Sequence, residues 1–154
     1  MVEVLVIYYS RGGRTETLAQ AIVDGASSVE NTTAVKKGVH YVTVDDFLRC
    51  DAIVFGSPNY FSYMAGLMKD FFDKALTVRE QVAEKPAAAF TSGGGSSNSA
   101  LLSLERMITS FRLHKTVDGI VSSGIPSSAD LILCKQMGEA LARAAIERAA
   151  LPTE

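Results

Sequence analysis

The sequence predicts an α/β fold organised around a five-stranded parallel β-sheet. Strand-like and helix-like segments alternate along the whole 154-residue chain, which is typical of βαβ units. Two of the strand-like segments, residues 2–8 and 51–56, are apolar almost throughout, as expected for central strands that helices cover on both faces. Right-handed crossovers in both directions from the first strand then give the strand order 2-1-3-4-5 in a three-layer sandwich.

The individual elements follow from the spacing of the hydrophobic residues. Apolar residues three and four positions apart, such as Leu18, Ile22 and Ala26, indicate helices with one face on a core. Residues 31–37 are β-prone but polar, which suits a strand at the edge of the sheet. The predicted strands are residues 2–8, 31–37, 51–56, 87–90 and 117–121, and the predicted helices are residues 14–28, 44–48, 62–76, 97–111 and 128–150.

Three of these helices carry apolar stripes that predict their buried faces. The Met and Phe stripe of residues 62–76 is typical of packing on a sheet rather than of a cofactor site. Ser127, followed by Asp130 three residues later, is a good N-cap for the last helix. The residues expected to face inward are Met64, Leu67, Met68, Phe71, Phe72 and Ala75 in residues 62–76, Leu101, Leu104, Ile108 and Phe111 in residues 97–111, and Leu133, Met137, Ala140, Leu141 and Ala144 in residues 128–150.

Length and composition favour one globular domain over residues 1–154. Hydrophobic residues make up 47% of the chain, and a chain of this length buries about 70% of its unfolded-state surface. No apolar run approaches the ~18 residues of a membrane span. The apolar run from Val2 is short and is not preceded by basic residues, so no signal peptide is expected. We therefore expect a cytoplasmic protein.

Charge and cysteine usage exclude two further classes. The 15 basic and 17 acidic residues give a formal net charge of −2, with neither sign gathered into a block, so a basic surface for nucleic acid is not expected. Cys50 and Cys134 form neither a Cys-x-x-Cys pair nor a metal-ligand cluster. They are expected to be reduced thiols packed in helices, and no metal site is expected.

The first predicted strand runs into a loop suited to bind an anion. The loop glycines allow positive φ, and the hydroxyls of Ser10 and Thr15 can donate to phosphate oxygens. The first N–H groups of the following helix lack internal partners and sit at the positive end of its dipole. The alternative is an ordinary strand-to-helix turn, in which the glycines make the bend and the hydroxyl of Ser10 or Thr15 only caps the helix. The loop comprises Ser10, Arg11, Gly12, Gly13, Arg14 and Thr15.

Residues 6–22 resemble the flavodoxin signature, which holds the phosphate of FMN. The resemblance rests on Tyr8, Ser10, Gly13, Thr15, Ala19 and Ile22. It implies a flavodoxin-like fold with FMN as cofactor and with residues 10–15 around its phosphate. Arg11 and Arg14 flank this loop, where they are either solvated or add charge to the phosphate or to an incoming anionic partner such as a nicotinamide cofactor.

Two more unusual loops follow strands three and four. Residues 57–63 contain a proline and an aromatic cluster, and residues 91–97 consist of Thr, Ser and Gly. Each could be a simple connection, but in the predicted strand order all three loops meet at one rim. A flavin needs a phosphate cradle, an apolar wall and backbone close to its polar edge, so this convergence predicts a flavin site.

The second loop and its helix resemble the flavodoxin-like NAD(P)H:quinone oxidoreductases, the group named after a tryptophan-repressor-binding protein. The matching residues are Gly56, Pro58, Phe61, Met64, Gly66, Met68 and Lys69, and the third loop matches through Thr91, Ser92 and residues 93–95. The resemblance implies that Asn59, Tyr60 and Phe61, which follow Pro58, line the isoalloxazine ring. It also implies that the pyrimidine edge or the ribityl chain is held by Ser92, Gly93, Gly94, Gly95 and Ser96.

The chain departs from that enzyme group in ways that bear on function. It lacks the extra residues that the group has in and after the third loop. It also has no histidine near residues 109–111, where the group places one beside the flavin. His40 is expected to be solvated, and His114 is expected at the opposite end of the sheet.

Three functions therefore remain open. The chain length and the missing segments favour a small FMN electron carrier that works with a redox partner protein. The alternative is an NAD(P)H-dependent quinone or flavin oxidoreductase, because a third loop without aromatic residues leaves the flavin face open; such enzymes are commonly homo-oligomers. A flavodoxin fold that binds no flavin and acts only as an interaction module is the third. No catalytic side chain is expected, since a flavin supplies the redox chemistry.

Overall fold

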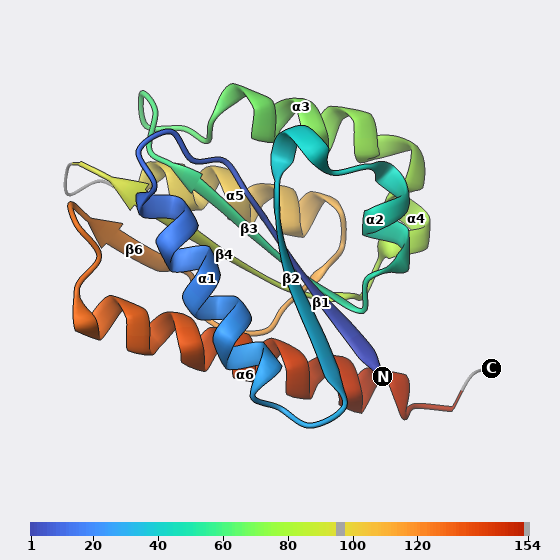
Figure 1. Cartoon of the computed structure of the whole chain (residues 1–154). Coiled ribbons are helices and arrows are strands. Elements are labelled where there is room, and N and C mark those ends of the chain that lie inside the picture. The colour runs from blue at the N-terminus through green and yellow to red at the C-terminus, as the bar shows by residue number, and fades with distance from the viewer. Residues whose placement is uncertain (95–97, 153–154) are drawn as a thin grey trace.

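The computed structural model describes residues 1–94 and 98–152. Figure 1 shows one twisted sheet, in which β2, β1, β3 and β4 lie in that order. Both β5 and β6 pair with β4 at its far edge. All of these pairings are parallel, and the predicted order 2-1-3-4-5 is confirmed. The strands are β1 Val2–Tyr8, β2 Thr32–Gly38, β3 Ala52–Pro58, β4 Pro86–Gly93, β5 His114–Lys115 and β6 Ile120–Ser123.

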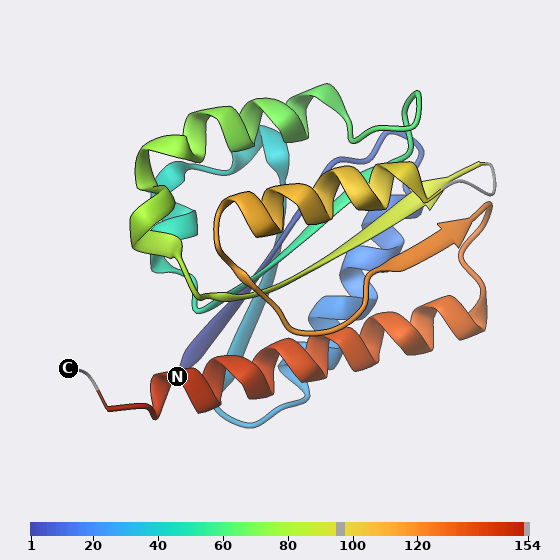
Figure 2. The same cartoon turned by 180° about the vertical axis from the view of Figure 1, so that it is seen from behind.

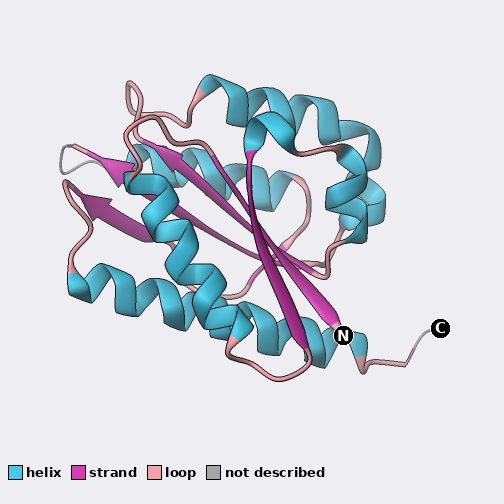
Figure 3. Cartoon of the chain, in the orientation of Figure 1, coloured by secondary structure: helices cyan, strands magenta, loops and turns pink. Residues whose placement is uncertain are grey.

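Helices cover both faces of this sheet, as Figures 1 and 3 show. Side chains alternate between the two faces along β1, so that Val4 and Val6 enter one core and Leu5 and Ile7 the other. The first core holds α1 Arg14–Ser27 and α6 Ser128–Ala149. The second holds α2 Val44–Arg49, α3 Gly66–Ala75, α4 Arg79–Val82 and α5 Ser99–Ser110.

The last predicted strand, residues 117–121, is wrong in its bounds. The chain pairs with the start of β4 through β5, leaves the sheet, and returns as β6 to pair with the end of β4. Gly119 lies in the departing segment, where a Cβ would come within 2.6 Å of the Leu101 side chain. Figure 2 shows this edge of the sheet from behind.

The third helix begins four residues later than predicted, at Gly66 rather than residue 62. The residues before it form a tight turn in which Tyr60 and Tyr63 exchange two backbone hydrogen bonds of 2.9 and 3.0 Å. Phe61 and Ser62, at the tip of this turn, have positive φ values of 54° and 64°. A left-handed backbone cannot continue a right-handed helix, so the helix starts only after the turn.

Two predicted buried faces are partly wrong. Leu67 of α3 is 42% exposed and Leu133 of α6 is 50% exposed, whereas the sequence pattern placed both inward. Ala140 and Ala144 are only half-buried. In α6 the buried positions are Cys134, Met137, Gly138, Leu141, Ala142 and Ala145.

The reason for the rotated face of α6 is its close contact with α1. A Cβ on Gly138 would overlap the carbonyl oxygen of Ile22, and a Cβ on Gly25 would overlap that of Lys135. Two glycines at the crossing therefore allow the helix backbones to touch. This contact turns α6 so that Gly138 and Ala142, rather than Leu133, face inward.

The end of the sheet opposite the loops contains a buried lysine. Lys85 is 6% exposed and donates to the carbonyl oxygens of Phe47, Leu48 and Cys50 at 2.6–2.8 Å. The ammonium thus satisfies carbonyl groups at and just beyond the last turn of α2, where a cation also complements the helix dipole. Burial lowers the pKa of Lys85.

Both cysteines are buried and free, Cys50 just after α2 and Cys134 within α6. Burial raises the pKa of each thiol to about 12, which keeps both protonated and unreactive at neutral pH. None of the helices in the described part of the chain has the length and apolar character that a membrane crossing requires.

Candidate flavin site

The carboxyl ends of β1, β3 and β4 meet at one end of the sheet, together with the loops that follow them (Figure 1). Tyr8 pairs with Gly56, and Pro58 pairs with Ser92, so each of the three strands ends within two residues of its neighbour. The amide of Tyr9 continues this pairing and donates to the carbonyl oxygen of Gly56 at 3.1 Å. In such sheets a ligand binds outside the carboxyl ends of the strands, at the point where the strand order reverses.

The first loop is closed by its own serine. The Gly13 amide donates to the Ser10 hydroxyl oxygen at 3.0 Å, and Gly13 itself has a positive φ of 92° just before α1. Within the described residues, no acceptor is recorded for the amides of Ser10, Arg11 and Gly12. Arg11 and Gly12 are also exposed. The loop therefore presents unsatisfied N–H groups at a helix N-terminus, as an anion site requires.

Thr15 and Ser92 join the first loop to the third. Their hydroxyl oxygens are 2.6 Å apart, and the residues are 1% and 5% exposed. The carbonyl oxygen of Ser92 also accepts from the Asn59 amide at 2.8 Å. When Ser92 donates to Thr15, the hydroxyl hydrogen of Thr15 is free for a phosphate oxygen.

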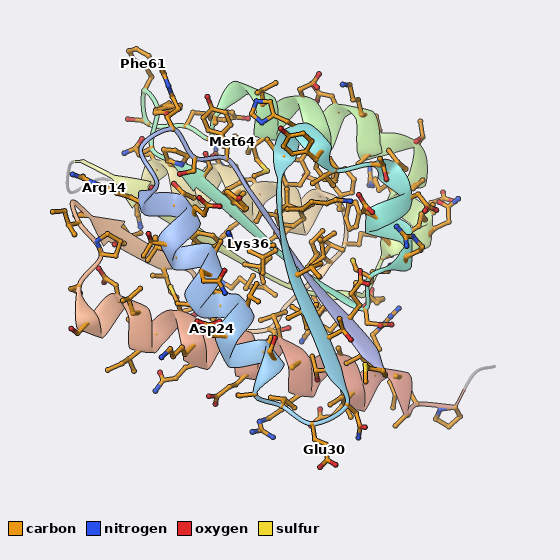
Figure 4. The ribbon with its side chains drawn as sticks, viewed as in Figure 1. Arg14, Asp24, Glu30, Lys36, Phe61 and Met64 are labelled. Atoms are coloured by element: carbon orange, nitrogen blue, oxygen red, sulfur yellow. The ribbon has the colours of Figure 1, made fainter. Side chains whose placement is uncertain are left out.

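The second loop is held by Ser57 at its base. The Ala65 amide donates to the Ser57 hydroxyl oxygen at 2.8 Å, which ties the start of the loop to its end. Pro58 is buried at the end of β3, and Asn59 and Tyr60 are half-buried. Phe61, in contrast, is fully exposed and points away from the body of the protein in Figure 4.

The third loop approaches the second very closely. Gly93 has a φ of 121°, and a Cβ there would lie 3.2 Å from the Asn59 amide nitrogen. Gly94 is exposed. The predicted ligand residues Gly95 and Ser96 lie outside the described residues.

The residues at this rim fit FMN. The free amides of the first loop suit the phosphate, and glycine at position 93 lets the backbone of the third loop lie against the second. The Asn59 Oδ1 atom is buried with no hydrogen-bond partner among the described residues. A buried acceptor without a donor is costly, and the N–H groups of an isoalloxazine ring are donors of the kind it needs.

An aromatic row that sequence reasoning missed continues from this rim to the end of β2. The Tyr9 ring lies edge-on to Tyr60 at 6.1 Å and stacks on His40 at 5.8 Å, and Tyr41 follows at 6.1 Å from His40. His40 is exposed, in agreement with the expectation that it is solvated, but it belongs to this row. His114 lies at the opposite end of the sheet, as expected, at the start of β5. No sequence motif links the row's members, because their proximity depends on the pairing of β1 with β2.

A second missed feature is a charged cluster beside the first loop. Tyr8 and Lys36 both donate to Glu16 Oε2 at 2.7 Å. Burial, together with the hydrogen bond to Glu16, raises the pKa of Tyr8 to about 12. The hydrogen bond from Lys36 is the main cause that lowers the pKa of Glu16. The carboxylate is therefore ionised at neutral pH and the phenol is protonated.

Arg11 and Arg14 are both exposed, and Figure 4 shows Arg14 at the same end of the sheet as the loops. No ion pair among the described residues involves either side chain. Both guanidinium groups can therefore meet an anion from solution.

The fold and the rim define a flavodoxin-like protein, and comparison with known proteins gives the family. The family model described as NADPH-dependent FMN reductase matches residues 2–124, and the chain belongs to this family. The resemblance to flavodoxin-like FMN-binding proteins is thus confirmed, and FMN is the cofactor that the family and its relatives indicate.

The similar proteins include flavodoxins and a chain much longer than this one. A flavodoxin of Aquifex aeolicus (strain VF5) is 38% identical over 96 residues, which are 62% of this chain and 52% of that protein. The chain thus matches about half the length of this relative. A flavodoxin structure from the domain Archaea is 27% identical with a TM-score of 0.82, covering 94% of this chain and 99% of that one. The rubredoxin oxygen:oxidoreductase of Desulfovibrio gigas shares the fold over 97% of this chain and 37% of its own, at 20% identity and a TM-score of 0.86.

Proposed function

We propose that this chain is an FMN-binding electron carrier whose partners are redox proteins. The observation that carries the proposal is the position of Ser92. Its hydroxyl contacts Thr15 of the first loop and its carbonyl oxygen binds the Asn59 amide of the second, so one residue of β4 holds all three loops in a single site. Three loops that served only as connections would not need hydrogen bonds between them.

The first loop binds the phosphate in this proposal. The amides of Ser10, Arg11 and Gly12 supply donors, and Gly13 provides the left-handed turn that aims them. Arg11 and Arg14 add positive charge from the solvent side. Thr15 adds a hydroxyl whose orientation is controlled by Ser92.

The second and third loops hold the ring. Asn59 Oδ1 accepts from a ring N–H, Tyr60 supplies an aromatic wall, and Gly93 and Gly94 keep one face free of side-chain bulk. Bound FMN supplies one- and two-electron redox chemistry, and the protein contributes binding, orientation and access. The exposed Phe61 then lies where a partner protein reaches the cofactor.

A second candidate is an NAD(P)H-dependent quinone or flavin oxidoreductase. It is favoured by the description of the matching family and by the absence of aromatic residues from the third loop. An open flavin face allows a nicotinamide or a quinone to stack on it. In this case the protein is a candidate homo-oligomer, and in both cases we propose one cytoplasmic FMN-binding domain spanning residues 1–154.

Spectroscopy of the purified protein tests the proposal. The protein should be yellow, or should quench the fluorescence of added FMN. A potentiometric titration should then show two separate one-electron steps, and anaerobic NADH or NADPH should bleach the flavin slowly. A colourless protein that binds no added FMN would contradict the proposal, and rapid bleaching would select the oxidoreductase instead.

A further inference from the structure

The two edges of the sheet differ in charge. At one edge, β2 carries Lys36 and Lys37. At the other edge, β6 pairs with β4 alone among the described strands, so residues 120–122 have no strand of that part of the chain on their outer side. Charged residues and prolines keep an edge strand from pairing with another chain. Residues 119–125 contain neither, and the nearest charged residues are Asp118 and Asp130.

An apolar groove lies beside this edge, between β6 and α6, and its volume is about 300 Å³. Val121 of β6 and Leu133 of α6 line the groove and are 39% and 50% exposed. Asp118 is its one charged lining residue in the described part of the chain. The hydrophobic spacing of α6 predicts a buried Leu133, whereas the single chain leaves half of this side chain in solvent. The groove is therefore an apolar surface that the fold itself does not cover.

We propose that the β6 edge and this groove form the interface of a homodimer, in which two copies of β6 pair antiparallel about a twofold axis. An axis through the middle of the strand places Val121 beside its symmetry mate and continues the sheet from one copy into the other. The strand has four residues, which supply few backbone hydrogen bonds. Burial of the apolar groove must therefore provide most of the association energy.

The lack of charge favours a second copy of this chain as the occupant. When a strand pairs with itself, each central residue lies close to the same residue of the other copy, so a charge there would repel its mate. Self-pairing of β2 would bring Lys36 and Lys37 near their symmetry mates, but the centre of β6 has no charge. Asp118 precedes β6, so antiparallel pairing places its two copies at opposite ends of the joined strands.

This dimer keeps both proposed flavin sites open. β6 runs parallel to β4, so its carboxyl end points toward the rim that carries the three loops. Antiparallel pairing therefore puts the two rims at opposite ends of the joined sheet. No residue of the proposed flavin site lines the groove, so the inference does not depend on whether the protein is an electron carrier or an oxidoreductase.

Sedimentation equilibrium of the full chain, with and without added FMN, tests the proposal. The unchanged protein should sediment with twice the chain mass of 16.5 kDa. Val121→Lys places two lysines side by side at the axis and should raise the dimer dissociation constant by roughly tenfold or more. Val35→Lys is the matched control, because Val35 is 40% exposed on the other edge strand, β2, and this variant should remain dimeric.

A charge swap makes the test specific to a symmetric interface. Val121→Glu should also dissociate the dimer, and an equimolar mixture with Val121→Lys should recover the dimer mass, because opposite charges then meet at the axis. Leu133→Lys leaves β6 unchanged and should dissociate the dimer through the groove. Far-ultraviolet circular dichroism establishes that each variant is folded, and FMN affinity is measured separately, so failure of the interface is distinguishable from failure of the flavin site.

Two results would overturn the proposal. A chain that remains monomeric at millimolar concentration has no such interface, and the β6 edge is then left to a different partner. A dimer that Val121→Lys and Leu133→Lys leave intact, or that Val35→Lys dissociates, uses another surface.

Discussion

The hydroxyl oxygens of Thr15 and Ser92 lie 2.6 Å apart in the protein interior, although 77 positions separate the residues in the chain. Thr15 lies in the first turn of α1, and Ser92 is near the end of β4. Their contact spans β3, which lies between β1 and β4 in the sheet. It therefore couples the geometry of the phosphate loop to that of the loop that follows β4.

Replacing Thr15 with valine should weaken both folding and FMN binding. Valine keeps the shape but leaves the Ser92 hydroxyl buried without its partner, which costs about 1–3 kcal/mol of unfolding free energy. Urea denaturation of the flavin-free protein measures the first effect, and FMN fluorescence titration measures the second. The double variant Thr15→Val/Ser92→Ala removes both hydroxyls and should recover part of the stability. If the losses of Thr15→Val and of Ser92→Ala add up to the loss of the double variant, the two hydroxyls are not coupled.

Replacing Gly13 with alanine should destabilise the first loop. Gly13 has a φ of 92°, and a left-handed backbone costs a residue with a side chain roughly 1–2 kcal/mol. Gly12→Ala is the matched control, because Gly12 lacks a positive φ and a Cβ there meets nothing within 4 Å. Thermal unfolding of the flavin-free variants compares the two. Equal unfolding temperatures would exclude backbone strain at Gly13.

Replacing Gly138 with alanine should separate α1 from α6. The new methyl group would overlap the Ile22 carbonyl oxygen, and overpacking of this kind costs about 1–3 kcal/mol. Gly66→Ala, in the first turn of α3, is the control, because a Cβ there meets nothing within 4 Å and the change should stabilise the protein by up to about 1 kcal/mol. Urea denaturation measures both. A neutral Gly138→Ala variant would mean that the helices move apart without loss of packing.

Tyr8 should ionise at a higher pH than an unperturbed tyrosine does. Its pKa is raised from 10.0 to about 12 by burial and by its hydrogen bond to Glu16. The ultraviolet absorbance of tyrosinate measures this directly, and Tyr8→Phe should remove the late phase. Tyr41→Phe, which changes an exposed ring, should leave that phase intact. A late phase that persists in Tyr8→Phe would assign it to another residue.

The same shift predicts a loss of stability in alkali. The folded state holds the Tyr8 proton more tightly than the unfolded chain does, so this contribution is fully present below pH 10.0 and is lost as the pH rises through about 12. Denaturation midpoints of the unchanged protein and of Tyr8→Phe should therefore differ less at high pH than at neutral pH. A difference that grows with pH would contradict the assignment.

The sequence alone was enough for the order of the strands and the two layers of helices, and it predicted the role of the first loop. These features depend on local patterns: apolar runs such as residues 51–56, helical spacing such as Leu18 and Ile22, and a glycine-containing turn between them. The pattern was least reliable where a face is set by a neighbour. Leu133 is exposed because two glycines bring α1 and α6 into backbone contact, and no periodicity within α6 encodes that contact.

The candidate site divides in the same way. The resemblance to known families predicted residues 10–15, 58–61 and 92–96, and the strand order predicted that their loops meet, because parallel strands place such loops at one rim. The tertiary structure decided how they are joined: through the Thr15–Ser92 hydroxyl pair, the contact of Asn59 with Gly93, and the aromatic row from Tyr60 to Tyr41. Each of these contacts links residues that are distant in the chain, so its existence depends on sheet registry and side-chain packing, which a one-dimensional pattern does not contain.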